Sequence, residues 1–297
     1  MSNNFYKTYH RYILFFILYL SLIFGFYFDE NLNFGAIPDW LYTDLPVIND
    51  LSHNIKKTLL NYEVYGHRHS PIYLIFLSIF KKIGFSLDAI RFLHLNLSLF
   101  LIIFFYKCLV LKFSKVEKNI LFLLSLSIFL SPTFRSLAIW PSTRLIGLIF
   151  FSISIYEFLK FLKTQKKINM WKNIIFLIVS SYVSPNFSLF IIFFFYHYLK
   201  KVNFKDLIYL LLFCLISALP AFYYIFILEV NFLSAKTPGL EAESPLGLSL
   251  NFSNKILIIS TICFYLLLPI INFKEILNNI KKIKLVELFF ITIFCLI

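Results

Sequence analysis

Long uninterrupted apolar stretches, separated by short polar connections, constrain this sequence more than any other feature. They cover, among others, residues 12–28, 89–111 and 143–162. A helix needs about 20 mostly apolar residues to cross the hydrocarbon core of a bilayer. The apolar residues run continuously instead of alternating with polar ones, which argues against a transmembrane barrel. Because 60% of the 297 residues are hydrophobic, far more than a soluble core of this size can use, we expect an all-α, polytopic transmembrane helical bundle.

The net charge of +13 has a topological explanation in such a protein. Lys and Arg collect in cytoplasmic loops and set the orientation of the spans, so we expect membrane lipids and no nucleic acid as partners. The four cysteines stand singly in apolar segments, without the spacing of a disulfide framework or a zinc site. The sequence therefore indicates no metal and no cofactor, and a divalent ion stays an alternative that no ligand pattern supports.

Charge along the chain predicts its orientation. Lys7 and Arg11 precede the first apolar stretch and place the N-terminus in the cytoplasm; no small-residue cleavage pattern follows, so we expect an uncleaved first span. Segment 29–70 holds six acids against three bases and fits an outer loop, as does segment 229–254. The clusters of basic residues expected on the inner side lie within 107–118, 160–172, 200–205 and 274–284.

The number of membrane crossings that the charge pattern allows predicts a short helix at the outer surface. Between Ser70, outside, and the lysines from 107 onward, inside, the number of crossings must be odd, and three would take about 60 residues at roughly 20 each. One crossing, 89–111, therefore remains, and residues 71–80 form a juxtamembrane or re-entrant helix after the first outer loop. The alternative is that lysines 107–118 lie outside, against the charge rule.

The remaining apolar stretches complete a single transmembrane domain, residues 1–297. At roughly 20 residues for each full crossing, we expect about 8–10 membrane segments. Segment 173–199 must enter the membrane and return to the side from which it entered, because basic clusters expected on the inner side flank it. Its two arms, of about 13 residues or ~20 Å each, flank Ser184-Pro185-Asn186 and predict a half-length hairpin. The last run, 285–297, is too short to cross, so we expect an incomplete helix and a truncated chain. The other expected spans are 119–131, 143–162, 206–228 and 255–272.

Several ionisable residues gather on the predicted outer side, where charges at membrane depth are functional candidates by default. They are Asp29, Glu30, His67, Arg68, His69, Arg91, Arg135 and Arg144. Each has a structural alternative. The two acids can simply mark the end of a helix in water, and Arg91 can extend to the interface. His67 and His69 form an HxH pair that lacks a third metal ligand at a recognised spacing.

Taken together, these residues predict transfer chemistry at the outer interface. A carboxylate at the membrane surface can act as general base toward an acceptor hydroxyl. Arginines near it can hold a phosphate through paired hydrogen bonds. A hairpin that reaches only part-way into the membrane leaves room for a lipid chain. The pattern favours a lipid-phosphate donor and a polar acceptor.

Three segments in the first two thirds of the sequence resemble those of a known enzyme family. YFDEN after the first span, HSPIYLIFLSIFKKIGFSLDAIRFLH, and ILFLLSLSIFLSP followed by SLAIWPSTRLIGLIFFSISIYEFLKFLK are similar to segments of the GT-C type, polyprenyl-phosphate-dependent membrane glycosyltransferases. That superfamily includes the protein mannosyltransferase and aminoarabinose transferase groups. The similarity covers roughly residues 12–200 and lies in pattern and order.

The resemblance implies roles for individual residues. Asp29 matches the acid that acts as catalytic base, with Glu30 beside it, and His69 matches the histidine at the mouth of the cavity. Arg91 and Arg144 match arginines for which contact with the donor phosphate is implied. Members often carry an acid two residues before that histidine, where this chain has His67. If that acid takes part in catalysis or binds a metal, this chain lacks it unless Asp39, Asp44 or Asp50 substitutes. The C-terminal half of such enzymes is longer and many carry an outer domain, and we expect neither in this sequence.

The implied activity is glycosyl transfer from an undecaprenyl- or dolichyl-type phosphate to an unknown acceptor, such as a lipid, another glycan or a protein. The expected location is the bacterial inner membrane, with the active site on the outer face. Two other classes stay open. A transporter or flippase for a lipid-linked or anionic substrate predicts internal repeats, which are not visible here, and a non-catalytic assembly subunit predicts that Asp29 affects only abundance.

Overall fold

This computed structural model describes residues 2–32, 35–65 and 70–227. The described residues are almost entirely helical and contain no strand, which confirms the all-α expectation. The chain divides into two compact units, Met1–Leu233 and Ser234–Ile297, and only the first contains described residues. The expected outer loop 229–254, the span 255–272 and the incomplete helix 285–297 lie outside the described residues.

Three described helices are long and apolar enough to cross a membrane: α6 (Leu87–Lys112), α9 (Thr143–Thr164) and α12 (Phe204–Phe222). They coincide with the expected spans 89–111, 143–162 and 206–228. Helix α6 is capped by the preceding Ser86, whose hydroxyl accepts a hydrogen bond from the backbone N–H of Ala89 at 3.1 Å. Asp88 lies in its first turn and Lys112 in its last, which is the charge order that the helix dipole favours.

The first apolar stretch forms α1 (Ser2–Tyr27), and its apolar part, Arg11–Tyr27, is shorter than the three long helices. The expected short helix at 71–80 is present as α5 (Ile72–Lys82). The described residues thus contain the helices expected at these two positions. The number of membrane segments in the whole chain stays a prediction.

The expected span 119–131 is not straight. Helix α7 (Lys118–Leu126) continues as the 3₁₀ turn η3 (Ser127–Leu130), and after Ser131 the chain enters α8 (Pro132–Ile139) at an angle of 67°. The residue before a proline disfavours helical backbone, and Ser131 is extended, with its hydroxyl capping the backbone N–H of Phe134 at 3.3 Å. If the bent pair is one span, the described part has up to four.

The expected hairpin at 173–199 also differs in its proportions. Its first arm is α10 (Lys167–Val183), of 17 residues, and its second is η4 (Pro185–Leu189) followed by α11 (Phe190–Leu199), of 10 residues. The break falls at Ser184-Pro185, as the proline predicts. The first arm is longer than expected because Lys167 and Lys172 lie inside the helix instead of in a loop.

The described part of the segment expected as an outer loop, 29–70, is largely helical. It contains α2 (Ala36–Pro38), the π-helical turn η1 (Asp39–Asp44), α3 (Leu45–His53), α4 (Ile55–Leu60) and η2 (Tyr62–Tyr65). Trp40, Ile48 and Tyr62 are almost completely buried, and α3 packs on α5. These residues form one continuous apolar core with α1, α6, α8 and α9, so this segment is held against the helices that carry the site.

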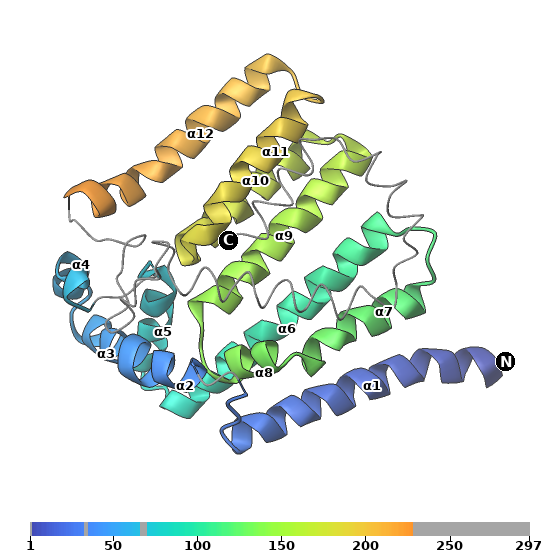
Figure 1. Ribbon diagram of the computed structural model, residues 1–297, viewed down its shortest axis with the longest axis horizontal. Coiled ribbons are helices and arrows are strands. Elements are labelled where there is room, and N and C mark those ends of the chain that lie inside the picture. Colours follow the sequence, from blue (N-terminus) through green and yellow to red (C-terminus); the bar gives the residue numbers. More distant parts are fainter. Residues whose placement is uncertain (1, 33–34, 66–69, 228–297) are drawn as a thin grey trace, which may run out of the picture. The chain divides into compact units, whose positions relative to one another are not determined.

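The long helices pack in sequence from α1 through α7, α6 and α9 to α10 (Figure 1). The interface of α9 with α10 is the most extensive and uses small and polar residues. Ser180 on α10 donates a hydrogen bond to the backbone carbonyl of Gly147 on α9 at 2.7 Å. Asn173 on α10 donates to Ser154 Oγ at 2.8 Å and accepts from Tyr198 OH of α11 at 2.6 Å. Small residues and interhelical hydrogen bonds hold apolar helices together where lipid replaces water.

Candidate functional site

The end of α1 positions the two acids through its backbone. The N–H of Glu30 donates to the carbonyl of Gly25 at 2.8 Å, and that of Asp29 donates to Phe26 at 3.3 Å. This is the double hydrogen bond of a Schellman cap, whose C′ residue adopts a left-handed conformation. Asp29 fills that position with φ of 53°, where glycine is usual and Asp is tolerated. The cap turns the two adjacent carboxylates in different directions.

Asp29 faces the start of α6. Its Oδ1 lies 2.6 Å from Nη2 of Arg91, whose Nη1 is 3.2 Å from Oδ1 of Asp88. The Arg91 side chain is 8% exposed, whereas that of Asp29 is 62% exposed. The Arg91 guanidinium carbon lies 3.7 Å from the ring centroid of Trp140 and 5.0 Å from that of Phe26. A buried, aromatic-flanked arginine therefore fixes an exposed carboxylate.

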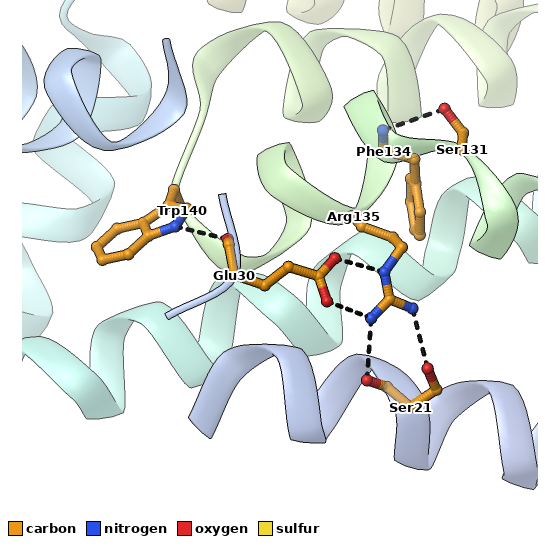
Figure 2. Close-up of polar contacts among 6 residues, drawn as sticks. All are labelled: Ser21, Glu30, Ser131, Phe134, Arg135 and Trp140. Carbon is orange, nitrogen blue, oxygen red and sulfur yellow. Dashed lines mark hydrogen bonds and ion pairs between the residues drawn. The ribbon is translucent and has the colours of Figure 1, made fainter. Parts of the chain in front are cut away.

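Glu30 faces the opposite way, toward Arg135 on α8 (Figure 2). Nε and Nη2 of Arg135 donate to the two carboxylate oxygens at 2.5 and 2.6 Å. Nη1 and Nη2 also donate to the hydroxyl and the carbonyl of Ser21 on α1, at 3.2 and 3.1 Å. The indole N–H of Trp140 donates to the backbone carbonyl of Glu30 at 3.0 Å. Both oxygens of the Glu30 carboxylate accept hydrogen bonds from Arg135. Glu30 therefore links the end of α1 to α8.

Trp140 lies between the two pairs. Its ring packs on Arg91, and its N–H holds the backbone of Glu30. One turn beyond Arg91, the fully buried His94 contacts the carbonyl of Leu137 through Nε2 at 2.7 Å and the hydroxyl of Tyr73 through Nδ1 at 2.5 Å. A carbonyl only accepts, so Nε2 carries the proton and Nδ1 accepts from the tyrosine. These contacts fix α5, α6 and α8 around the site.

Arg144, at the start of α9, is less constrained. Its Nη2 lies 3.9 Å from Asp39 in η1, and its side chain is 54% exposed. The other acids of the outer segment have different surroundings. Asp44 is buried, and the carboxylate of Asp50 accepts a hydrogen bond from Tyr65. Burial, together with that bond, raises the pKa of Tyr65 above its ordinary value.

The structure brings together four of the residues that the sequence singled out, namely Asp29, Glu30, Arg91 and Arg135. Arg144 pairs separately with Asp39. His67, Arg68 and His69 lie outside the described residues. Asp88 was missed, although an acid three residues before an arginine on a helix is a recognisable pairing signal. Trp140 was treated as an interface aromatic, and no sequence pattern indicates its contact with Arg91.

Among the described residues, no group of three or more His, Cys, Asp or Glu side chains is arranged to hold a metal ion. Comparison with known proteins adds no assignment: no protein-family model, no curated protein and no solved structure matches this chain. Three described helices could span a membrane, which suggests a membrane protein.

Proposed function

We propose that this chain is a GT-C type glycosyltransferase embedded in the bacterial inner membrane as a polytopic helical bundle. It moves a sugar from a polyprenyl-phosphate-linked donor to a lipid, glycan or protein acceptor at the outer face. Its N-terminus is cytoplasmic. The resemblance of residues 12–200 to that superfamily motivates the proposal, and the geometry around Asp29 supports it.

The single observation that carries the proposal is the state of the Asp29 carboxylate. It is exposed, yet the left-handed cap and Arg91 fix it in place. Arg91 engages only Oδ1, and no described residue donates to Oδ2. A general base needs this combination of fixed position and an accessible oxygen.

In the proposed reaction, Asp29 takes the proton of the acceptor hydroxyl as its oxygen attacks the anomeric carbon of the sugar. The bond from that carbon to the phosphate oxygen breaks, and polyprenyl phosphate leaves with the electron pair. Glu30 serves as a positioning residue, because both of its oxygens are bound by Arg135. Arg91 and Arg135 are largely buried and bind their carboxylates at 2.6 and 2.5 Å. The Arg144 side chain is 54% exposed and lies 3.9 Å from Asp39, so its guanidinium is the better candidate for the donor phosphate.

The experiment follows sugar release from a radiolabelled polyprenyl-phosphate donor pool in membranes that contain the wild type, Asp29→Asn or Asp88→Asn. Asn tolerates the left-handed cap and keeps the size of Asp. Asp88→Asn is a matched control, because it removes the other exposed carboxylate on the same arginine. Protein abundance is measured in parallel.

We expect Asp29→Asn to lower turnover by about 10²–10⁴-fold, the usual contribution of a general base, and Asp88→Asn to change it by less than about tenfold, as loss of an exposed ion pair allows. A wild type that binds the donor but leaves its glycosidic bond intact would favour the transporter or flippase class. A wild type that neither binds nor consumes it would favour an assembly subunit.

A further inference from the structure

The end of the helices opposite Asp29 is strongly basic. Figure 1 shows the C-terminal ends of α6 and α9 and the N-terminal end of α10 at the same edge, and α9 packs on both other helices. The lysines at these helix ends and in the segments that follow α6 and α9 are Lys107, Lys112, Lys115, Lys118, Lys160, Lys163, Lys166, Lys167 and Lys172. Within the described residues, Glu157 pairs with Lys160 at 3.3 Å and Asp206 pairs with Lys167 at 2.7 Å.

Two of these lysines, from different helices, converge on one aromatic ring. Nζ of Lys107 on α6 lies 5.7 Å from the centroid of Tyr156 on α9, and Nζ of Lys160 lies 5.1 Å from the same centroid. Lys107 is also 4.7 Å from the ring of Phe104, which meets Tyr156 edge to face at 5.8 Å. We name Phe104, Lys107, Tyr156 and Lys160 the Tyr156 cluster. It brings two ammonium groups, from two helices that pack on each other, within 6 Å of one ring.

The cluster lies at matched depth on both helices. Lys107 is five residues before the last residue of α6, and Lys160 is four residues before the last residue of α9. At 1.5 Å per residue these offsets are about 7.5 and 6 Å. Tyrosine and lysine at such positions near the ends of membrane helices lie at the level of the lipid headgroups.

An apolar stripe continues from the cluster toward the middle of α6. Phe100 and Ile103 are exposed and lie seven and four residues before Lys107, on the same helix face. A ligand whose phosphate meets the lysines can therefore lay a hydrocarbon chain along Phe100 and Ile103. This combination of cations and an exposed apolar stripe fits a phospholipid better than a free phosphate or a nucleic acid.

We propose that the Tyr156 cluster binds the headgroup phosphate of an anionic phospholipid such as phosphatidylglycerol. The inference goes beyond the proposed transferase activity and requires only that α6 and α9 lie in a membrane. Basic sites between helices at the cytoplasmic end are a recurrent way to hold anionic lipids. Lys107 has no carboxylate partner among the described residues, so its charge is available to the phosphate.

Substitution of Glu157 should change the lipid affinity in the opposite direction to substitution of the lysines. Its carboxylate is buried and engages Lys160 through Oε1, so it competes with the lipid for that ammonium group. Replacing it with Gln removes one negative charge from beside the cluster at nearly constant volume. Glu157→Gln therefore strengthens binding of an anionic lipid, whereas loss of either lysine weakens it.

The test uses the purified full chain in detergent, titrated with phosphatidylglycerol or phosphatidylcholine at about 0.15 M salt, where charges further apart than ~8 Å are screened. Native mass spectrometry measures the occupancy of bound lipid. The variants are Lys107→Gln with Lys160→Gln, and Glu157→Gln. The matched control pair, Lys172→Gln with Lys201→Gln, removes two exposed lysines outside the cluster.

We expect the wild type to bind phosphatidylglycerol more tightly than phosphatidylcholine. The Lys107→Gln, Lys160→Gln double variant should bind phosphatidylglycerol about 30-fold more weakly than the wild type, from ~1 kcal/mol per lysine. The control pair should change this affinity by no more than about twofold. Glu157→Gln should bind more tightly. Equal binding of the two lipids, equal losses in the two pairs, or weaker binding in Glu157→Gln overturns the proposal. If the double variant does not stay monodisperse, Lys107→Gln alone, expected to bind about fivefold more weakly, replaces it. No donor turnover is measured, so this test fails or succeeds independently of the proposed transferase activity.

Discussion

Gly25→Ala is the substitution that most sharply tests how the end of α1 is held. A Cβ at this position would lie 2.5 Å from Oε2 of Glu30, 3.0 Å from Nη2 of Arg135 and 3.0 Å from Cδ1 of Ile139. Ala alone is favoured over Gly inside a helix by about 0.5–1 kcal/mol. The carboxylate must move, however, and breaks the 2.6 Å bond from Nη2, which as a charged hydrogen bond is worth about 1.5–3 kcal/mol.

The balance predicts that Gly25→Ala lowers the free energy of unfolding by about 1–2 kcal/mol, from these two terms. In a Glu30→Ala background the clash with Oε2 is absent, and the contacts that remain are with the ends of the Arg135 and Ile139 side chains, both at 3.0 Å. These ends can shift by a few tenths of an ångström, so the same substitution should stabilise the protein by at most about 0.5–1 kcal/mol. A double-mutant cycle of Gly25→Ala and Glu30→Ala measures this reversal in the sign of the change in unfolding free energy. The assay is SDS-induced unfolding in mixed micelles, followed by circular dichroism. Equal effects in the two backgrounds would refute the argument that Glu30 is pinned by Arg135.

Three further predictions follow from contacts elsewhere. Gly147→Ala places a Cβ 2.7 Å from that of Ser184 and should destabilise the α9–α10 interface by about 1–3 kcal/mol, measured in the same unfolding assay. Tyr198→Phe removes the donor to Oδ1 of the buried Asn173 and should cost about 1–3 kcal/mol, visible as a lower melting temperature. Asp29→Gly keeps the left-handed cap, so its melting temperature should stay close to that of the wild type while donor turnover falls as in Asp29→Asn; a large loss of stability would contradict this account.

The long helices could be predicted from sequence because hydropathy alone determines them. Stretches 89–111 and 143–162 correspond to α6 and α9 within two residues. Stretch 206–228 corresponds to α12 together with the π-helical turn η5 (Tyr223–Ile227) that follows it. The helix at 71–80 and the break at Ser184-Pro185 were also predictable, from parity and from the missing N–H of proline. These features depend on local residues and on the membrane as a solvent.

What could not be predicted depends on contacts between distant residues. Glu30 and Arg135 are 105 positions apart, and no local pattern pairs Glu30 with Arg135 rather than Arg91. The bend between α7 and α8 was missed because the stretch 119–131 was taken to end at Ser131, whereas the helix resumes at Pro132. The folded outer segment was missed because its charge was considered before its buried residues, such as Trp40 and Ile48.

The central claim is that Asp29 acts as a base and not only as a helix cap or a partner of Arg91. The most direct measurement is the ratio of donor turnover in Asp29→Asn to that in Asp88→Asn, at equal protein abundance in the same membranes. We predict a ratio of about 10⁻¹ or lower, because general-base catalysis is worth at least about 10² and loss of the exposed Asp88 pair costs less than about tenfold. A ratio near one would contradict it, since the two carboxylates would then serve Arg91 equally.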